Sequence, residues 1–465
     1  MKISIKNFKS IKNLQNFTLK PITILSGVNS SGKSSFIQLL LLLKQTVELE
    51  SAIQPLYLSG EYFKVRKMVD LLHEKNITKI LEISFEYSKE DFAPIKSSAI
   101  SILNSLGNFN CKVEFHYSVD DSGKARISHF SVKYTFSEGK NPFLEINSAT
   151  DNIYSINSND EIFGKGFLMT APKSAEVTFL SIYPTFFNEE ITIDSDGGKE
   201  YGEKKGFIEL EGVKQITNSF LREISYIGPL REEPKEEYFI SGQNIKVGTK
   251  GEFVAQILSE LGGKEIDFFK IGVNDEGKIS YLSTRLPLLE FVKYWLCEVF
   301  KLALDIHIDS VDDSYRILLT NQSKIEVNIR HVGFGISQIL PILVDGLLLS
   351  ENGTLVLEQP EIHLHPKVQS LLFDFLYGIT LKEKRVVVET HSSHFITRMR
   401  RRVAEDIGNS MKERINLTFI EDEAFRSIQL DDFGTLDYFP ADFIEASSEE
   451  LNAIISAQMN KKISS

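Results

Sequence analysis

The stretch GVNSSGKS, Gly27 to Ser34, constrains the fold more than any other part of the chain. It follows a short apolar segment, Ile22 to Leu25, and precedes an apolar run from about Ser35 to Leu43, which predicts a strand, a tight turn and a helix. Glycines in such a turn let main-chain N–H groups close around phosphate oxygens, and the helix N-terminus adds positive potential. Lys33 can reach terminal phosphates, and the Ser34 hydroxyl suits magnesium. We therefore predict a phosphate-binding loop in an α/β fold.

Two later apolar segments predict strands that end in polar side chains. Thr354 to Leu357 runs into Glu358, and Arg385 to Glu389 is followed by Thr390 and His391. An α/β sheet presents its ligand-binding residues at the carboxyl ends of its strands, beside the phosphate loop. A second glycine-rich stretch precedes them and opens an apolar helix within His331 to Leu349. The order of these elements is more specific than any one of them.

The middle of the chain, from about Ile80 to Phe220, has a different pattern. Alternating runs such as Val113 to Val119 and Phe130 to Phe136 predict antiparallel strands with one buried face. Asp194 to Gly206 is predicted to be a polar turn, and helical periodicity returns in Leu288 to Leu304. No sustained heptad pattern occurs, so we expect no long coiled coil.

The composition is that of a folded globular protein, with 42% hydrophobic and 25% charged residues in 465. Two distant cysteines, Cys111 and Cys297, argue against a disulfide framework, and no apolar run is long enough to span a bilayer. We expect a cytoplasmic protein that does not bind membranes. The net charge of -12 argues against a surface that binds nucleic acid everywhere, although Arg398 to Arg402 could form a local contact. The solvated face of a helix is the favoured interpretation of that cluster.

The chain resembles the ATP-binding head of ABC-class ATPases, in the prokaryotic branch similar to SMC, RecF and OLD-type proteins. The opening IKNFKSIKNLQNFTLKPITILSGVNSSGKSS carries the resemblance, as do VGFGISQILPI, LVLEQPEIHLHP and VVVETHSSHF. They are similar to the N-terminus, signature, Walker B with D-loop, and switch-histidine segments of that branch. The resemblance covers roughly Met1 to Leu43 and Tyr226 to His394. It implies an ABC-type P-loop head with a β-rich antiparallel lobe and insertion.

The resemblance also implies the domain boundaries and the site residues. We expect the ATPase in residues 1–80 and 221–430, the β-rich insertion in 81–220 and a C-terminal tail in 431–465. Glu358 would replace the Walker B aspartate and bind Mg²⁺ with Ser34, and His391 would sense the γ-phosphate. The residues expected to hold the phosphates of ATP are Gly27, Asn29, Ser30, Gly32, Lys33, Ser34 and Ser35. Those expected to close on the ATP of a second subunit are Gly333, Gly335, Ser337 and Gln338. Gly333 departs from the resembled pattern, because it stands where the signature usually has a serine.

The catalytic position is unusual, because Gln359 precedes Pro360 where the resembled pattern has a glutamate that acts as general base. A glutamine cannot accept the proton, but it can orient a water, and phosphoryl transfer depends mostly on positioning and electrostatic stabilisation. Glu361, two residues later, could supply the missing carboxylate. A third interpretation is that Gln359 is inert and that the protein binds ATP as a clamp.

Two smaller questions stay open at the level of sequence. Arg231, in the GPLR segment, either contacts the nucleotide or pairs with an acidic neighbour. A zinc site formed by His363, His365, His391 and His394 is the weaker alternative to the D-loop and switch interpretation, because HExxH is absent.

The resemblance suggests a slowly hydrolysing homodimer or higher homo-oligomer that controls a separate effector, nuclease-like, in bacterial anti-phage defence. No nuclease motif is recognisable in the chain, and the segment Phe433 to Ala446 has the composition of a docking tail. The alternative is a DNA repair or maintenance ATPase that binds duplex DNA across dimerised heads, so contact with nucleic acid stays open. A scaffold with a vestigial site is disfavoured because Lys33, Ser34 and His391 are all present.

Overall fold

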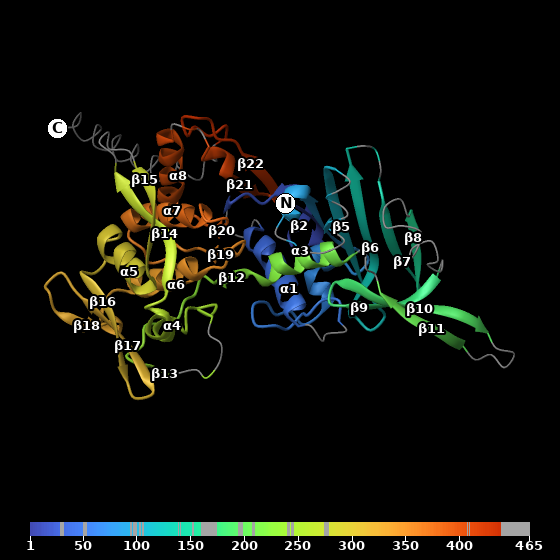
Figure 1. The fold of residues 1–465 in the computed structure, drawn as a ribbon, viewed down its shortest axis with the longest axis horizontal. Helices are drawn as coiled ribbons and strands as arrows, with labels where there is room; N and C mark the ends of the chain where they lie inside the picture. The colour runs from blue at the N-terminus through green and yellow to red at the C-terminus, as the bar shows by residue number, and fades with distance from the viewer. Residues whose placement is uncertain are drawn as a thin grey trace, which may run out of the picture. The chain divides into compact units, whose positions relative to one another are not determined.

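A computed structural model provides the fold (Figure 1). It divides into two compact units, Met1–Leu19 with Gly32–Ile224 (unit 1), and Lys20–Ser31 with Ser225–Ser465 (unit 2). The structure describes residues 1–27, 32–49, 54–93, 95, 100–101, 104, 107–137, 139, 141–150, 153–159, 174–193, 199–206, 210–239, 242, 246–273, 279–406, 408 and 410–438.

Unit 1 is built on a ten-stranded sheet of order β11-β10-β9-β8-β7-β6-β5-β4-β1-β2. Each neighbouring pair for which a register is given is antiparallel, and along β5 the buried and partly exposed side chains alternate. The alternation arises because successive side chains of a strand point to opposite faces. The strands are β1 Lys2–Phe8, β2 Ile11–Thr18, β4 Leu81–Ser88, β5 Phe109–Val119, β6 Ala125–Phe136, β7 Phe143–Thr150, β8 Ile153–Asn159, β9 Ser174–Leu180, β10 Tyr183–Ile193 and β11 Lys199–Gly206.

Two helices, α1 (Lys33–Glu48) and α3 (Glu211–Arg222), pack against each other in unit 1 and lie side by side in Figure 1. Aromatic contacts join them to the sheet, with Phe36 of α1 against Phe17 of β2 at 4.9 Å between ring centroids. On α3, the Thr217 hydroxyl lies 2.9 Å from that of Tyr87 in β4. The buried face of the sheet and these two helices therefore form the core of unit 1.

Unit 2 contains a six-stranded sheet of order β12-β19-β20-β3-β21-β22. Its central strands β19, β20, β3 and β21 are parallel, and β22 pairs antiparallel with β21 at the edge. Parallel strands covered on both faces are apolar along their whole length, which explains the runs TLVL and RVVV. The strands are β3 Ile22–Gly27, β12 Ile224–Ile227, β19 Thr354–Glu358, β20 Arg385–Glu389, β21 Ile415–Glu421 and β22 Ala424–Ile428.

Helix α7 packs on β20 and β3 and against α8, and α6 contacts α7 (Figure 1). The helices of unit 2 are α4 Val254–Leu261, α5 Leu288–Lys293, α6 Phe334–Leu348, α7 Pro366–Thr380 and α8 Ser393–Glu405, with a π-helix at Tyr294–Val299. Its smaller sheets contain β13 Tyr238–Phe239, β14 Glu265–Val273, β15 Ile279–Pro287, β16 Asp305–Val311, β17 Ser314–Thr320 and β18 Glu326–Asn328. Short 3₁₀ turns in the chain are Met68–Leu71, His73–Lys75, Lys89–Phe92, Ile329–His331 and Lys412–Arg414. Trp295, fully buried, packs on Phe268 and Phe375 and marks the aromatic centre of this unit.

The structure confirms the predicted α/β class with an antiparallel β-rich part, and the described residues contain no long coiled coil. Two local predictions were wrong. Residues 199–206 form β11 rather than a turn, because they pair with β10. The helix predicted for Leu288 to Leu304 ends at Val299, since β16 begins at Asp305. Within the described residues, no helix combines the length and apolarity that a membrane crossing requires.

The arginine cluster on α8 is largely part of the fold. Arg398 and Arg402 both donate to Asp374 of α7, and Arg402 is 2% exposed. Arg400 donates to the carbonyl of Gly434, and Arg401 pairs with Glu405. The prediction of a solvated helix face is therefore correct for the exposed Arg401 but wrong for Arg402, which is buried in an ion pair.

Candidate functional site

The carboxyl ends of β19, β20 and β3 meet at one edge of the unit 2 sheet. In register, Glu358 pairs with Glu389, and Glu389 pairs with Leu25, two residues before Gly27. The Thr390 N–H donates to the Leu25 carbonyl at 3.0 Å. The structure thus brings together the beginning of the phosphate-loop motif, the Walker B residue and the segment before His391, as the sequence predicted.

Gly27 is a position where only glycine fits. Its φ is +142°, and a Cβ there would lie 2.1 Å from the carbonyl oxygen of Ile420 in the adjacent strand β21. Asn29 and Ser30, two of the predicted phosphate ligands, lie outside the described residues.

In unit 1 the rest of the motif forms the beginning of α1. Gly32, with φ +112°, precedes the helix, and a Cβ there would lie 2.8 Å from the Ser10 hydroxyl. Lys33 is 3% exposed, whereas Ser34 is partly exposed. The Ser35 hydroxyl lies 2.8 Å from that of Ser10, in the turn between β1 and β2. Ser35 is therefore held by the fold, and Ser34 retains access at the helix N-terminus.

Glu358 ends β19 and is bonded to a tyrosine that the sequence did not single out. Tyr226, in β12, donates its hydroxyl to Glu358 Oε1 at 2.9 Å. Burial raises the pKa of Glu358, and the bond from Tyr226 partly offsets the rise. A desolvated carboxylate with this environment is stabilised by a cation.

Gln359 and Glu361 lie in the turn after β19. Gln359 has φ +44°, an uncommon conformation for a residue with a side chain, and its N–H donates to the Glu389 carbonyl at 2.8 Å. Glu361 Oε1 accepts the His391 main-chain N–H at 2.6 Å. Burial raises the pKa of Glu361, and its Oε2 is buried with no hydrogen-bond partner among the described residues. The turn after β19 is thus bonded directly to the main chain of His391.

Arg231 joins this turn to α6. It is 7% exposed, its Nη2 donates to the Glu358 carbonyl at 3.3 Å and its Nη1 to Gln338 Oε1 at 3.5 Å. Burial lowers the pKa of Arg231 to about 10, and the nearby charge of Glu361 opposes the decrease. Arg231 therefore bonds to Gln338 and to the Glu358 main chain rather than to a carboxylate, and its contact with the nucleotide stays a prediction.

The predicted signature residues divide into exposed and buried groups. Gly333 is the exposed N-cap of α6, with φ −60° and nothing within 4 Å of an added Cβ. At Gly335 an added Cβ would approach the His363 carbonyl to 3.3 Å. Ser337 and Gln338 are buried, and Ser337 donates to the Phe334 carbonyl. Among these four residues the exposed position is therefore Gly333, at the beginning of α6.

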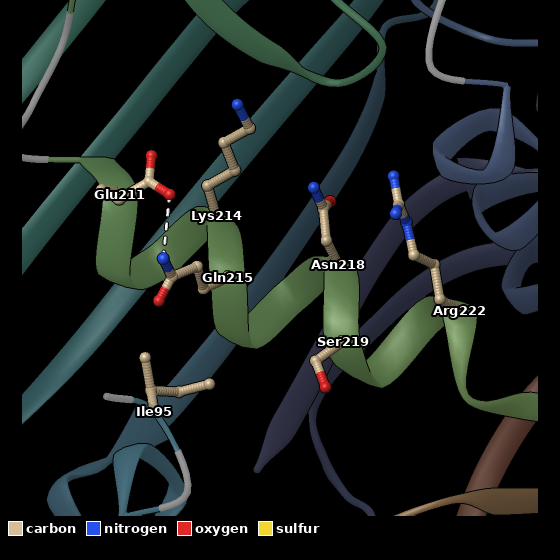
Figure 2. A pocket seen from close by; sticks show the side chains of 7 residues that line it. All are labelled: Ile95, Glu211, Lys214, Gln215, Asn218, Ser219 and Arg222. Carbon is tan, nitrogen blue, oxygen red and sulfur yellow. Dashed lines mark hydrogen bonds between the residues drawn. The ribbon is translucent and has the colours of Figure 1, made fainter. Parts of the chain in front are cut away.

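The described residues contain no cluster of three or more His, Cys, Asp or Glu side chains arranged to hold a metal ion. Of the four histidines weighed as zinc ligands, His365 instead caps α7 by accepting the Lys367 N–H at 3.2 Å. A hollow of about 470 Å³ lies along α3 in unit 1, lined by none of the motif residues (Figure 2). Within its lining, Gln215 donates to Glu211, and Arg222 donates to the Val47 carbonyl outside it.

Sequence reasoning missed Tyr226 and Ser10. Tyr226 belongs to ISYIGPLR, where a short strand before Gly-Pro was a usable signal for another strand of the central sheet. Ser10 lies in the turn of the first hairpin, and only the packing of that turn on α1 reveals its contact with Ser35.

Residues 1–396 match the family model of the AAA ATPase domain. The chain belongs to this family. Its motif order is that of an SMC- and RecF-like ABC-type ATPase, as the motifs had indicated.

This AAA-family ATPase is similar to one curated relative over a short segment and to solved SMC head domains over most of its length. It is 44% identical over 57 residues to the DNA replication and repair protein RecF of Nitrosococcus oceani, a match over 11% of this chain and 16% of that relative's length. A crystal structure of an SMC head bound to the C-winged helix domain of ScpA matches with 10% identity and TM-score 0.40, covering 92% of this chain and 97% of that one. An SMC head with an extended coiled coil, bound to the C-terminal domain of ScpA derived from Pyrococcus furiosus, matches with 11% identity and TM-score 0.39, covering 97% and 98%.

Proposed function

We propose that this ATPase binds ATP with Mg²⁺, hydrolyses it slowly, and uses nucleotide-dependent oligomerisation to control a separate effector, a nuclease-like protein, in bacterial anti-phage defence. The observation that carries the ATPase part is the carboxyl edge of unit 2, where Gly27, Glu358 and the segment before His391 converge. The defence setting comes from the resemblance to OLD-type proteins.

The residues present fit a nucleoside triphosphate. Gly27 and Gly32 occupy positions where a Cβ would collide with the protein, so the main chain of the loop is free of side chains at both ends. The sixteen-residue helix α1 begins at Lys33, and its first N–H groups suit phosphate oxygens. Lys33 would hold the terminal phosphates, with Gly27, Asn29, Ser30, Gly32 and Ser35 supplying the remaining phosphate contacts.

The acidic edge fits a divalent cation. Ser34 and Glu358 would hold Mg²⁺, which supplies charge neutralisation at the phosphates when bound. Burial raises the pKa of Glu358, so a nearby cation would restore the charged form of this carboxylate. Tyr226 leaves Glu358 Oε2 for this role because it occupies Oε1.

Gln359 is our choice for the residue that orients the attacking water. The alternative base, Glu361, has one oxygen bonded to the His391 main chain at 2.6 Å, which favours a role in holding the switch histidine. A glutamine positions a water through its amide but cannot take its proton, so slow turnover follows.

A second subunit would complete the site through the beginning of α6. Gly333 and Phe334 are exposed there, Phe334 at 55%, and the helix N-terminus favours an anion. Gly335 allows close approach, whereas Ser337 and Gln338 would support this surface from inside. We propose a homodimer as the smallest active assembly.

The separate effector is part of the proposal because the motifs recognisable in the chain are those of a nucleotide site, and none is a nuclease motif. Most of the proposed docking tail, residues 439–446, lies outside the described residues. The match with RecF supports the second candidate, a DNA repair or maintenance ATPase that binds duplex DNA.

Lys33→Ala tests the ATPase assignment, with Lys12→Ala as an exposed control in the same unit. Calorimetry should detect no ATP binding to Lys33→Ala and normal binding to the control. Undiminished affinity in folded Lys33→Ala protein would contradict the phosphate-loop assignment.

The effector hypothesis has a separate test. The product of an adjacent nuclease-like reading frame should co-purify with the wild type in the presence of ATP and be lost with Lys33→Ala, together with protection against phage. Duplex DNA binding that requires ATP, with no effect on phage plating, would favour the repair alternative.

A further inference from the structure

Two buried or partly buried side chains outside the predicted motifs converge on Glu358. Tyr226 bonds to its carboxylate at 2.9 Å, and Arg231 bonds to its main-chain carbonyl at 3.3 Å. Tyr226 lies in β12, the strand beside β19, and Arg231 lies in the segment that follows β12. One neighbouring segment therefore fixes both the side chain and the main chain of the residue proposed to bind Mg²⁺.

The other end of the Arg231 guanidinium contacts α6. Its Nη1 donates to Gln338 Oε1 at 3.5 Å, and Gln338 is 5% exposed in the first turns of the helix. The exposed N-cap, Gly333, belongs to the same helix. Arg231 is thus a direct physical connection between the beginning of α6 and the end of β19.

The bonding of Arg231 is unusual for a buried arginine. Its two hydrogen bonds are long, and its Nε is buried with no partner among the described residues. A buried charge is costly without a bonded partner. We would therefore expect a purely structural arginine to donate two parallel hydrogen bonds to a carboxylate. The nearby charge of Glu361 raises the pKa of Arg231, yet both hydrogen bonds of Arg231 go to other residues. Such loose bonding suits a contact that changes during the working cycle.

We propose that Tyr226 and Arg231 are positioning residues of the ATPase site, and that Arg231 transmits displacement of the α6 N-terminus to Glu358. The inference rests on the proposed function, in which α6 closes on the ATP of a second subunit. Closure moves Gln338, Arg231 follows its amide, and the Glu358 carbonyl shifts with the guanidinium. ATP bound at α6 thereby adjusts the Mg²⁺ ligand of the same chain.

A double-mutant cycle tests this connection. Arg231→Met and Gln338→Met should each lower the single-turnover hydrolysis rate about ten-fold, while ATP affinity changes less than about two-fold. If the two side chains act through one contact, the double variant is no slower than the slower single variant. Independent effects would instead multiply, and that result would overturn the relay.

Arg414→Met is the matched control, because Arg414 also has a buried Nε without a partner among the described residues and donates to a carbonyl, that of Thr380. Its rate per bound nucleotide should equal that of the wild type. Arg231→Lys keeps the charge but removes the guanidinium. Its hydrolysis rate should still be low if Arg231 must contact both Gln338 and Glu358. A wild-type rate in Arg231→Lys contradicts the geometric role, and this variant serves if Arg231→Met fails to fold.

Tyr226→Phe separates the second contact. The Mg²⁺ concentration for half-maximal hydrolysis should rise about three- to ten-fold, with the rate at saturating Mg²⁺ unchanged. Tyr294→Phe, which removes a hydroxyl bonded to the Ile271 main chain in the same unit, should leave the Mg²⁺ dependence unaltered. Equal Mg²⁺ dependence in Tyr226→Phe and the wild type would contradict the positioning role. A wild type that fails to bind ATP would instead contradict the proposed function itself.

Discussion

Two buried clusters in unit 2 contain arginines and carboxylates but are bonded in opposite ways. Around Asp374, Arg398 Nε donates at 2.9 Å and Arg402 Nε at 2.6 Å, and a further Arg402 bond measures 3.1 Å. Around Arg231, the two hydrogen bonds measure 3.3 and 3.5 Å, and neither acceptor is a carboxylate oxygen.

The difference separates a cluster that holds helices together from one that can change. Asp374 joins α7 to α8 with its bonding capacity filled, so any displacement breaks several charged hydrogen bonds. The cluster of Arg231, Glu358 and Glu361 leaves Arg231 Nε and Glu361 Oε2 without partners among the described residues. Bringing a cation or phosphate to that cluster therefore breaks little existing bonding.

Asp374→Asn tests whether the Asp374 cluster stabilises the fold. The substitution leaves Arg402 buried beside a neutral amide, and removing one partner of a buried pair costs about 3–5 kcal/mol. Urea unfolding followed by fluorescence of Trp295, the single tryptophan, should show this loss. The ATPase rate of the remaining folded protein should stay near the wild-type value.

Asp345→Asn is the matched control for that measurement. Asp345 is also buried, but its carboxylate accepts from the neutral Ser225 hydroxyl, at 2.9 and 2.7 Å. An amide oxygen can replace that acceptor, so the loss should be about 1 kcal/mol. Equal losses in the two variants would show that the Asp374 cluster has no special stabilising role.

Gln359→Glu and Glu358→Gln test the roles of these two residues in hydrolysis. A true base at position 359 should raise single-turnover hydrolysis about ten-fold or more, since general base catalysis typically contributes 100-fold or more. Glu358→Gln should lower the hydrolysis rate by weakening Mg²⁺ binding. Adding a carboxylate at position 359 and removing the one at position 358 should therefore change the rate in opposite directions.

Glu361→Gln tests the remaining assignment of the base. Its amide oxygen can still accept the His391 N–H, so turnover should fall only about three-fold. If Glu361→Gln is inactive and Gln359→Glu matches the wild type, Glu361 is the base. If Gln359→Glu is slower and Glu361→Gln unchanged, the clamp interpretation becomes the better one.

The sequence predicted the Asp374 cluster less well than the residues at the carboxyl edge of the unit 2 sheet. Gly27, Glu358 and His391 follow from motif order, because strand ends of an α/β sheet meet at one edge. Asp374 gave no signal, since an acid within the apolar helix α7 reveals its importance only when α8 packs against it. Arg231 was noticed, but its contact with Gln338 joins residues 107 positions apart.

The strand β11 shows a different limit of sequence reasoning. Its sequence KEYGEKKG is polar and contains two glycines, so propensity favours a turn, and only pairing with β10 makes it a strand. The predicted domain boundaries remain predictions, whereas the two units themselves separate at Leu19, Gly32 and Ile224.

Two carboxyls of the Arg231 cluster, Glu358 and Glu361, predict how stability depends on pH. Burial raises the pKa of both Glu358 and Glu361 above the ordinary value of 4.5. A carboxyl whose pKa is higher in the folded state binds its proton more tightly there, so its charged form lowers stability at neutral pH and protonation removes this penalty. Glu361→Gln should therefore be more stable than the wild type at pH 7, with a difference that shrinks as the pH falls through the raised pKa.

Hydrolysis should respond in the opposite direction. Mg²⁺ binding requires charged Glu358, whose pKa burial raises, so at subsaturating Mg²⁺ the rate should fall on acidification while the free energy of unfolding does not fall in parallel. Rates and urea midpoints measured on the same samples provide the check. Loss of rate and of stability with one common midpoint would assign the pH effect to unfolding.

Gly333→Ser has the smallest expected effect. Position 333 has an ordinary φ of −60° and free space for a side chain, and serine is a good N-cap, so the free energy of unfolding should change by only a few tenths of a kcal/mol. The resembled signature usually has serine there, and the added hydroxyl offers a phosphate donor at the exposed beginning of α6. ATP-dependent dimerisation measured by sedimentation should strengthen by about two- to ten-fold, because one neutral hydrogen bond contributes about 0.5–1.5 kcal/mol. Gly335→Ser is the contrasting variant, since its Cβ would approach the His363 carbonyl to 3.3 Å and interfere with the same surface. If both variants dimerise like the wild type at every ATP concentration, the beginning of α6 is not the surface that closes on nucleotide.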